Sequence, residues 1–313
     1  MPLSIALFGQ APLAVDVLDR LLAEGHRIAG VFAPLAGDRP DPLAARAAAL
    51  GLRSFQRRYY QKRSGEPVPE ALAEYRELDV DLNVLASFTY FMPAALRDAP
   101  RHGSLCFHPS LLPRFRGGAA LQWQVMCGEP ETGVSIFIPD DGIDTGPVAV
   151  QRGGVQIAPD DTAGSLFFKK LYPLGVEALL EAVRDVERGT RKRFVQDEAL
   201  ATYQGLADDS VAAVDLGRSA AEIDRQVRGC DPQPGAFVRF GARVVRLLDT
   251  RLEPGNDALA PGTVRAVDAS GLQIALRGGV LRVARVRADA GKEAAQAFAA
   301  RAGLAPGARL ENG

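Results

Sequence analysis

Short apolar runs alternate with amphipathic stretches along residues 1–194. Each apolar run is closed by a glycine, a proline or a polar residue, which predicts strands that are buried on both faces. Strands that alternate with helices are typical of an α/β domain with a mainly parallel sheet. The main predicted strands of this region are Leu3–Gly9, 27–33, Asp79–Ser87, Gly103–Phe107, Thr132–Pro139 and 147–151.

Helical spacing fills the stretches between these strands. In the first of them, the apolar residues Val15, Leu18 and Leu22 recur at helical intervals, and Gly25 marks the end of the helix. In folds of this kind, ligands bind beyond the carboxyl ends of the strands, where the strand order reverses. We therefore expect the functional residues of this domain at that edge of the sheet.

The pattern changes after residue 200. Short apolar runs between 236 and 287 are separated by Gly, Pro and Asp, which predicts a small β-barrel or a similar all-β unit. We predict an α/β fold class: a Rossmann-like domain with a mainly parallel sheet at 1–194, a linker at 195–206, and a smaller, OB-like all-β domain at 207–313.

Composition and charge narrow the classes of function. Lys and Arg number 37 against 38 Asp and Glu, which argues against a broad nucleic-acid-binding surface but leaves a local basic patch open. The three cysteines are far apart and only three histidines occur, so a zinc site or a disulfide framework is not expected. No apolar run approaches the roughly 18 residues of a membrane span, and we expect a cytoplasmic protein without a membrane partner.

Two common motifs can be set aside. The first strand–helix turn, "FGQAP", has a single glycine, so it is neither a dinucleotide-binding fingerprint nor a phosphate-binding loop. The tripeptide Asp-Thr-Gly at 144–146 occurs once, whereas an aspartic protease needs two such aspartates in one site.

His108 and Asp144 are the candidate chemical pair. His108 directly follows the predicted strand Gly103–Phe107, and Asp144 lies in a Gly- and Pro-rich segment after Thr132–Pro139. An imidazole can take up a proton near neutral pH, and a neighbouring carboxylate fixes its tautomer. The alternative is a structural histidine and a turn aspartate that caps local N–H groups. The two residues alone leave both interpretations open.

The sequence "FHPSLLPRFRG" (107–117), followed by "DDGIDTG" (140–146), resembles the formyltransferase family that uses 10-formyltetrahydrofolate. This family includes methionyl-tRNA formyltransferases and the N-terminal hydrolase domain of 10-formyltetrahydrofolate dehydrogenase, and the hydrolase domain is the branch most similar to this chain. The resemblance covers nearly the whole chain. Further segments that carry it are Asp81–Ser104, Pro159–Thr162, Ala201–Gly205 and Asp231–Phe237.

The resemblance implies roles for named residues. His108 corresponds to the general acid/base of the family and Asp144 to its carboxylate partner. The implied cosubstrate is 10-formyltetrahydrofolate, which becomes tetrahydrofolate, and no metal is implied. The segment Ile138–Ile143 is expected to face the pterin ring across the pocket. The implied folate-contacting residues are Tyr90, Phe91, Met92, Ser110, Leu111, Leu112, Pro113, Ile138, Asp140 and Asp141.

Cys106 departs from the pattern of the transferases, which carry asparagine two residues before the histidine. A thiol is a weak hydrogen-bond donor, and losing one oxyanion donor costs about 2.7–4 kcal/mol in a reference enzyme. The hydrolase domain also lacks this asparagine, so Cys106 favours hydrolysis or an unusual acceptor. Cys106 itself is either a buried strand residue or a thiolate that takes the formyl group, with His108 lowering the pKa of the thiol.

Several functions stay open. The segment Pro34–Ala44 is short and mixed in charge, whereas methionyl-tRNA formyltransferases carry a longer, lysine-rich insertion there. The formyl acceptor is water, a small molecule, a carrier or a tRNA. A non-catalytic folate-binding protein is the alternative from another class.

Overall fold

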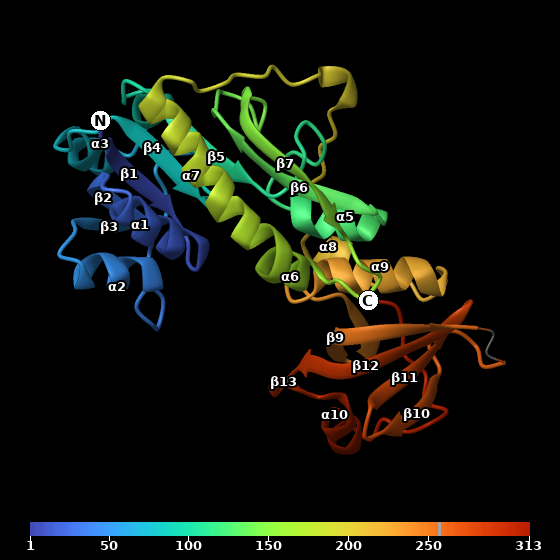
Figure 1. The fold of residues 1–313 in the computed structure, drawn as a ribbon. Helices are drawn as coiled ribbons and strands as arrows, with labels where there is room; N and C mark the ends of the chain where they lie inside the picture. Colours follow the sequence, from blue (N-terminus) through green and yellow to red (C-terminus); the bar gives the residue numbers. More distant parts are fainter. Residues whose placement is uncertain (256–257) are drawn as a thin grey trace. The chain divides into compact units, whose positions relative to one another are not determined.

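The computed structural model describes residues 1–255 and 258–313, which form two compact units (Figure 1). The first unit contains residues 1–118, 133–155 and 169–203, and the second contains 119–132, 156–168 and 204–313. Two stretches of the predicted first domain, 119–132 and 156–168, therefore group with residues 204–313. Residues 195–203, in the predicted linker, group with the first unit, and the predicted domain boundaries stay a prediction.

A seven-stranded sheet forms the centre of the first unit, with the order β3-β2-β1-β4-β5-β6-β7. The first five strands in this order are parallel, and β6 is antiparallel to β5. The prediction of a mainly parallel α/β sheet is confirmed. Its strands are β1 (Ser4–Gly9), β2 (Arg27–Pro34), β3 (Ser54–Arg57), β4 (Leu82–Ala86), β5 (Ser104–His108), β6 (Glu131–Phe137) and β7 (Val148–Gln156).

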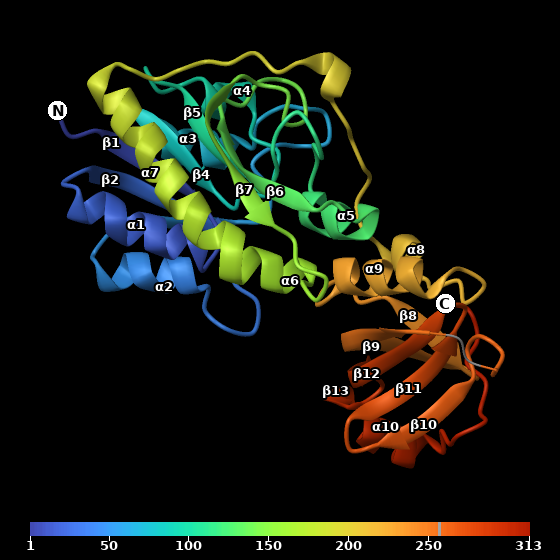
Figure 2. The same ribbon diagram turned by 45° about the vertical axis from the view of Figure 1, so that its right-hand side comes forward.

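Helices cover both faces of this sheet. All six residues of β1 are buried, as expected for a central parallel strand. Helices α1 (Leu13–Ala23) and α7 (Tyr172–Arg188) contact each other, and α1 also packs on β1 and α7 on β5; both lie in front of the sheet in Figures 1 and 2. The other helices of this unit are α2 (Pro42–Ala49), α3 (Pro69–Arg76) and α4 (Ala94–Arg97).

Three sequence predictions need correction in this unit. The buried face of α1 consists of Leu13, Ala14, Val17, Leu18 and Leu21, so Val15 and Leu22 only border it. Strand β3 was not predicted, because its alternating pattern is confined to four half-exposed residues at the edge of the sheet. The sequence also predicts one long helical stretch over residues 162–189, which the structure interrupts with a π-helical turn at Phe167–Leu171.

Gly175 allows α7 to approach the strand that carries His108. A Cβ atom at this position would lie 2.4 Å from Cε2 of Phe107, closer than any real contact, so only glycine fits there. The residue before His108 is thus fixed from behind by a helix. This close packing makes the end of β5 a rigid platform.

The second unit contains an antiparallel sheet with the strand order β10-β11-β12-β9-β8, and β13 also pairs with β12 (Figure 2). Residues 307–311 bond to Gly262 just before β10, to Val264 in β10 and to Arg239 in β8, which joins the two outer strands. The prediction of a smaller all-β unit is confirmed. Its strands are β8 (Phe237–Phe240), β9 (Arg243–Pro254), β10 (Val264–Asp268), β11 (Gly271–Leu276), β12 (Gly279–Ala288) and β13 (Gly291–Ala294).

Short helices accompany the antiparallel sheet. Helix α9 begins with a capping box in which Ser219 and Glu222 satisfy each other's backbone N–H groups. Two buried aliphatic residues of α9, Ile223 and Val227, pack in the same core as the strands. The helices of this unit are α5 (Ala120–Cys127), α6 (Ala163–Leu166), α8 (Asp209–Ala212), α9 (Ala220–Cys230) and α10 (Ala295–Ala302).

Candidate active site

The strand register brings the sequence-predicted pair to the expected edge of the sheet. Cys106 in β5 is level with Leu85 in β4, and Leu85 is level with Phe8 in β1. His108 is the last residue of β5, two positions beyond this row. The strand order reverses between β1 and β4, so His108 lies one strand away from the place where α/β folds bind ligands.

Both ring nitrogens of His108 face oxygen atoms. Nε2 lies 2.8 Å from the carbonyl oxygen of Phe115, and Nδ1 lies 3.4 Å from Oδ2 of Asp144. The His108 side chain is only 7% exposed, so water competes little for these contacts. A carbonyl oxygen can only accept, which means that Nε2 carries a proton. In the neutral imidazole, Nδ1 then keeps its lone pair and can act as a base.

Asp144 is fixed in an unusual backbone conformation. Its φ angle is +55°, in the left-handed region that non-glycine residues seldom adopt. The backbone N–H of Gly117 donates to Oδ2 of Asp144 at 2.7 Å, the same oxygen that faces His108. A positive φ in a residue that faces a buried histidine is typical of a functional site.

The loop between β6 and β7 builds its own scaffold around Asp144. Asp140 Oδ1 accepts hydrogen bonds from the N–H of Gly142 (3.1 Å) and the hydroxyl of Thr145 (2.5 Å). A Cβ atom on Gly146 would lie 1.8 Å from the carbonyl oxygen of Ile138, so this position requires glycine. The carboxylate of Asp140, predicted to contact folate, is therefore engaged within its own loop.

Arg97 fastens the tip of the same loop. Its guanidinium is 10% exposed and pairs with Asp98 and, at 2.8 Å, with Oδ1 of Asp141. The Asp141 side chain is 91% exposed. Asp141, another predicted folate contact, is thus held by a side chain from α4.

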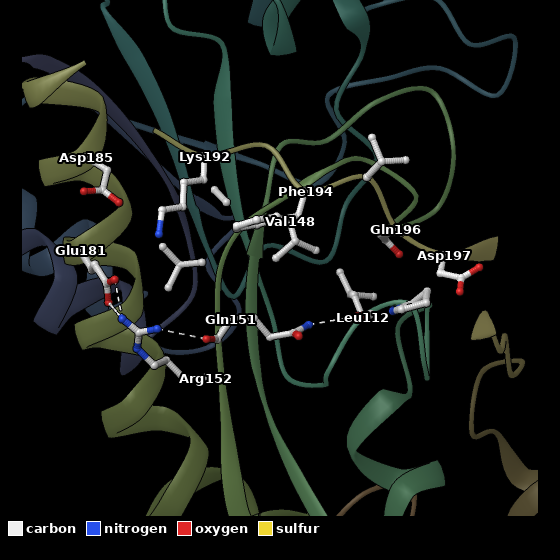
Figure 3. Close-up of a pocket in the computed structure, with 14 residues that line it drawn as sticks. Leu112, Val148, Gln151, Arg152, Glu181, Asp185, Lys192, Phe194, Gln196 and Asp197 are labelled. Carbon is white, nitrogen blue, oxygen red and sulfur yellow. Dashed lines mark hydrogen bonds and ion pairs between the residues drawn. The ribbon is translucent and has the colours of Figure 1, made fainter. Parts of the chain in front are cut away.

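The "HPSLLP" segment is held by buried hydrogen bonds. The Ser110 hydroxyl donates to the carbonyl of Arg114 (2.7 Å), and Ser135 Oγ donates to the carbonyl of Ser110 (2.7 Å). Gln151 on β7 donates to the carbonyl of Leu112 (2.9 Å), as Figure 3 shows. Ser110 is fully buried, and its hydroxyl fixes the loop.

The predicted linker contributes side chains to this region. Gln196 is 7% exposed and accepts two hydrogen bonds from the guanidinium of Arg116, which also pairs with Glu198. The Thr202 hydroxyl accepts from the N–H of Phe115 (2.8 Å). Isolated polar side chains in an aperiodic segment carry no pattern, so the sequence alone did not indicate these residues.

Cys106 lies in an apolar cluster with Phe137 and Leu112, against which Tyr90 and Met92 pack. Burial, with a smaller effect from the negative charge of Asp144, raises the pKa of the Cys106 thiol well above its ordinary value. This environment favours the buried, protonated thiol over the thiolate. The cluster unites several predicted folate-lining residues, whereas Phe91 stands apart and is 70% exposed.

A pocket of about 340 Å³ lies on the other side of the "HPSLLP" loop (Figure 3). Leu112, Pro113 and Gln196 line it together with residues of β7 and α7, and Arg152 pairs with Glu181 at its side. Neither His108 nor Asp144 lines this pocket. It therefore borders residues that contact the His108–Asp144 segments without containing the candidate pair itself.

Among residues 1–255 and 258–313, no group of three or more His, Cys, Asp or Glu side chains is arranged to hold a metal ion. Within the same residues, no helix combines the length and the apolar character that crossing a membrane requires.

Comparisons with known proteins identify the family. The family described as "Formyl transferase" matches residues 3–183, and "Formyl transferase, C-terminal domain" matches residues 208–303. The chain belongs to the formyl transferase family. The first match includes residues of both units, and the second lies within the second unit.

Two relatives show equal identity. The chain is 36% identical to human mitochondrial 10-formyltetrahydrofolate dehydrogenase over 83% of its own length, and it spans 28% of that protein. It is also 36% identical to the methionyl-tRNA formyltransferase of Ruegeria pomeroyi, over 94% of each chain. Identity alone does not choose between these two activities.

Solved structures agree on the fold. HypX from Aquifex aeolicus, determined in complex with tetrahydrofolic acid, superimposes with a TM-score of 0.73, and the match covers 96% of this chain and 47% of HypX. An N-formyltransferase from Helicobacter canadensis gives 0.67 over 93% of this chain and all of that chain. The identities are 20% and 17%, so these likenesses concern the fold.

Proposed function

We propose that this formyl transferase family member removes the formyl group of 10-formyltetrahydrofolate by acid–base catalysis at His108 and Asp144. The observation that carries the proposal is the contact of His108 Nδ1 with Asp144 Oδ2 at the carboxyl edge of the sheet. The apolar cluster around Tyr90, Met92 and Leu112 supports it, because a flat heteroaromatic ring binds between apolar walls.

Hydrolysis illustrates the proton path. The His108–Asp144 pair takes a proton from the water whose oxygen attacks the formyl carbon. With that proton on Nδ1, the ring faces the carboxylate of Asp144, which stabilises the imidazolium. As the carbon–N10 bond breaks, the pair returns a proton to N10 of the folate, and the products are tetrahydrofolate and formate. Phe115 and Gly117 keep the two side chains in place throughout.

Water is the acceptor that we favour. Cys106 stands where the transferases of the family carry asparagine, and its buried thiol is a weak donor for an oxyanion. The hydrolase domain of 10-formyltetrahydrofolate dehydrogenase, which this chain resembles, also lacks this asparagine, and that shared departure supports water as the acceptor. The same proposal includes a small thiol, an amine or a carrier as the formyl acceptor.

The decisive experiment is turnover of 10-formyltetrahydrofolate without any acceptor. We expect formate and tetrahydrofolate to appear at equal rates in the presence of the full chain, and His108→Ala to abolish both. If the protein neither binds the folate nor forms formate, the proposal is wrong. Folate binding that leaves the ligand intact, unaffected by His108→Ala, would identify a non-catalytic folate-binding protein instead.

Methionyl-tRNA formyltransferase is the second candidate, because the relative from Ruegeria pomeroyi aligns over 94% of both chains. Adding initiator methionyl-tRNA to the same assay separates the candidates. Formylmethionyl-tRNA that forms faster than formate would favour this second candidate over hydrolysis.

A further inference from the structure

Gln196 connects two segments that must be aligned for the proposed chemistry. Its Oε1 accepts hydrogen bonds from Nε (3.1 Å) and Nη2 (2.8 Å) of Arg116. Its Nε2 donates to the carbonyl oxygens of Asp144 (2.8 Å) and Gly146 (2.7 Å). The amide oxygen therefore meets only a donor, and the amide nitrogen meets only acceptors.

The chemistry of these partners fixes the orientation of the amide. A guanidinium only donates and backbone carbonyls only accept, so the oxygen of Gln196 must face Arg116 and the nitrogen must face the loop. Neither a carboxylate nor a thioether could bond to both sides at once. The position therefore requires an amide of this length.

Asp144 depends on such support. Its left-handed backbone, with φ +55°, costs of the order of 1–3 kcal/mol and persists only where the surroundings impose it. Gln196 bonds to the carbonyl of Asp144 and to that of the residue two positions later, on either side of Thr145. Arg116, its other partner, directly precedes Gly117, whose N–H holds the Asp144 carboxylate. Gln196 thus contacts both the backbone of the Asp144 loop and the residue before Gly117, whose N–H orients the Asp144 carboxylate.

We propose that Gln196 is a positioning residue that holds the Asp144 carboxylate against Nδ1 of His108. The predicted linker is then part of the catalytic apparatus of the first unit. This inference rests on the proposed function only in treating His108 and Asp144 as the reacting pair.

The test compares Gln196→Met with Gln226→Met in the full chain. Gln226 is a matched control: it is also 7% exposed, and its Nε2 donates to two backbone carbonyls, those of Val211 (2.7 Å) and Ala213 (3.0 Å), in the second unit. Both variants lose a buried amide whose nitrogen donates to two backbone carbonyls, but only the oxygen of Gln196 also accepts from a guanidinium. We expect both variants to lose thermal stability, a kcat reduced about ten- to hundredfold by Gln196→Met alone, and KM for the formyl-folate within about threefold.

A second readout needs no turnover. The chain has three histidines, so the ring ¹⁵N shifts of His108 can be followed with His26 and His102 as internal references. We expect Gln196→Met to move the shift of His108 Nδ1 and leave the other two unchanged. The inference is wrong if Gln196→Met lowers stability while kcat and the His108 shifts match those of Gln226→Met. If wild-type protein shows no turnover, the shifts alone decide whether Gln196 positions Asp144 or only stabilises the fold.

Gln196→Glu is a second test of the inference in case Gln196→Met does not fold. The carboxylate still accepts from Arg116, but it meets the carbonyls of Asp144 and Gly146 with no proton to donate. We expect the same loss of kcat and the same shift at His108. Full kcat in a folded Gln196→Glu protein would overturn the inference.

Discussion

The two sides of the candidate active site use polar groups in opposite ways. On the β5–β6 side, the hydroxyl of Ser110, the carboxylates of Asp140 and Asp144 and the amide of Gln196 are all engaged in hydrogen bonds. Next to β1 and β3, aromatic rings form a largely buried cluster. Phe8, Tyr60, Phe88 and Tyr90 contact one another with centroids 5.4–6.3 Å apart.

Under the proposed function, the two sides have different tasks: one moves protons and the other binds a flat ligand. Groups that move protons must be held within a fraction of an ångström, and the dense hydrogen bonds of the β5–β6 side provide that rigidity. Under the proposed function, a flat ligand would meet the partly buried rings of Phe88 and Tyr90, whereas Phe8 and Tyr60 lie in the core. In the described part of the chain, the buried hydroxyl of Tyr60 has no hydrogen-bond partner, which fits a cluster held together by ring packing.

The largest effect should come from the rigid side. We expect His108→Asn to lower the turnover of 10-formyltetrahydrofolate by about 10²–10⁴-fold, because the proton acceptor is removed while a similar shape is kept. Formate release under saturating substrate measures the change, and ligand binding serves as the control for folding. A variant that retains a tenth or more of the wild-type rate would contradict the role of His108.

Gly146→Ala tests whether the Asp144 loop is as constrained as its contacts indicate. The added methyl group would meet the carbonyl of Ile138 at 1.8 Å, and we expect a loss of about 1–3 kcal/mol in the free energy of unfolding. Denaturant titration measures it. Gly37→Ala is the control, since a Cβ atom there meets nothing within 4 Å and should change stability by less than about 0.5 kcal/mol. If the two variants are equally stable, the Asp144 loop can shift to accommodate the added methyl group.

Cys106→Ala separates packing from chemistry. Because burial raises the pKa of the thiol well above its ordinary value, the thiol stays protonated through the neutral range and carries no reactive charge. We expect formate release within about threefold of wild type, the same pH profile, and a stability loss of about 1 kcal/mol from the lost packing. A rate that rises with pH through a thiol ionisation in wild type, and not in the variant, would favour the thiolate.

Tyr60→Phe should have the smallest effect. Removing a buried hydroxyl without a partner relieves a desolvation cost, so we expect the protein to be stabilised by up to about 1 kcal/mol. Tyr75→Phe is the contrasting variant, because the Tyr75 hydroxyl donates to Oδ1 of Asn83 at 2.8 Å and its loss should destabilise. Thermal melts of both proteins give the comparison, and a destabilised Tyr60→Phe protein would mean that the hydroxyl is bonded.

Local sequence patterns were sufficient for most of the architecture. The apolar runs of β1 and β4 and the glycine at the end of α1 follow from burial and backbone preferences that neighbouring residues express. The same patterns failed at β3, which is short and half-exposed, and at the face of α1, where the angle of packing selects among adjacent apolar residues.

By itself, the sequence determined the α/β region, the all-β region and the motif that contains His108 and Asp144, because periodicity and motif spacing are local properties. Only the tertiary structure decided which groups hold this pair. Gln196 is 52 residues from Asp144 and 80 from Arg116, and Arg97 is 44 from Asp141. A single polar side chain has no period, so its partners emerge only when the chain folds and burial forces each donor to find an acceptor.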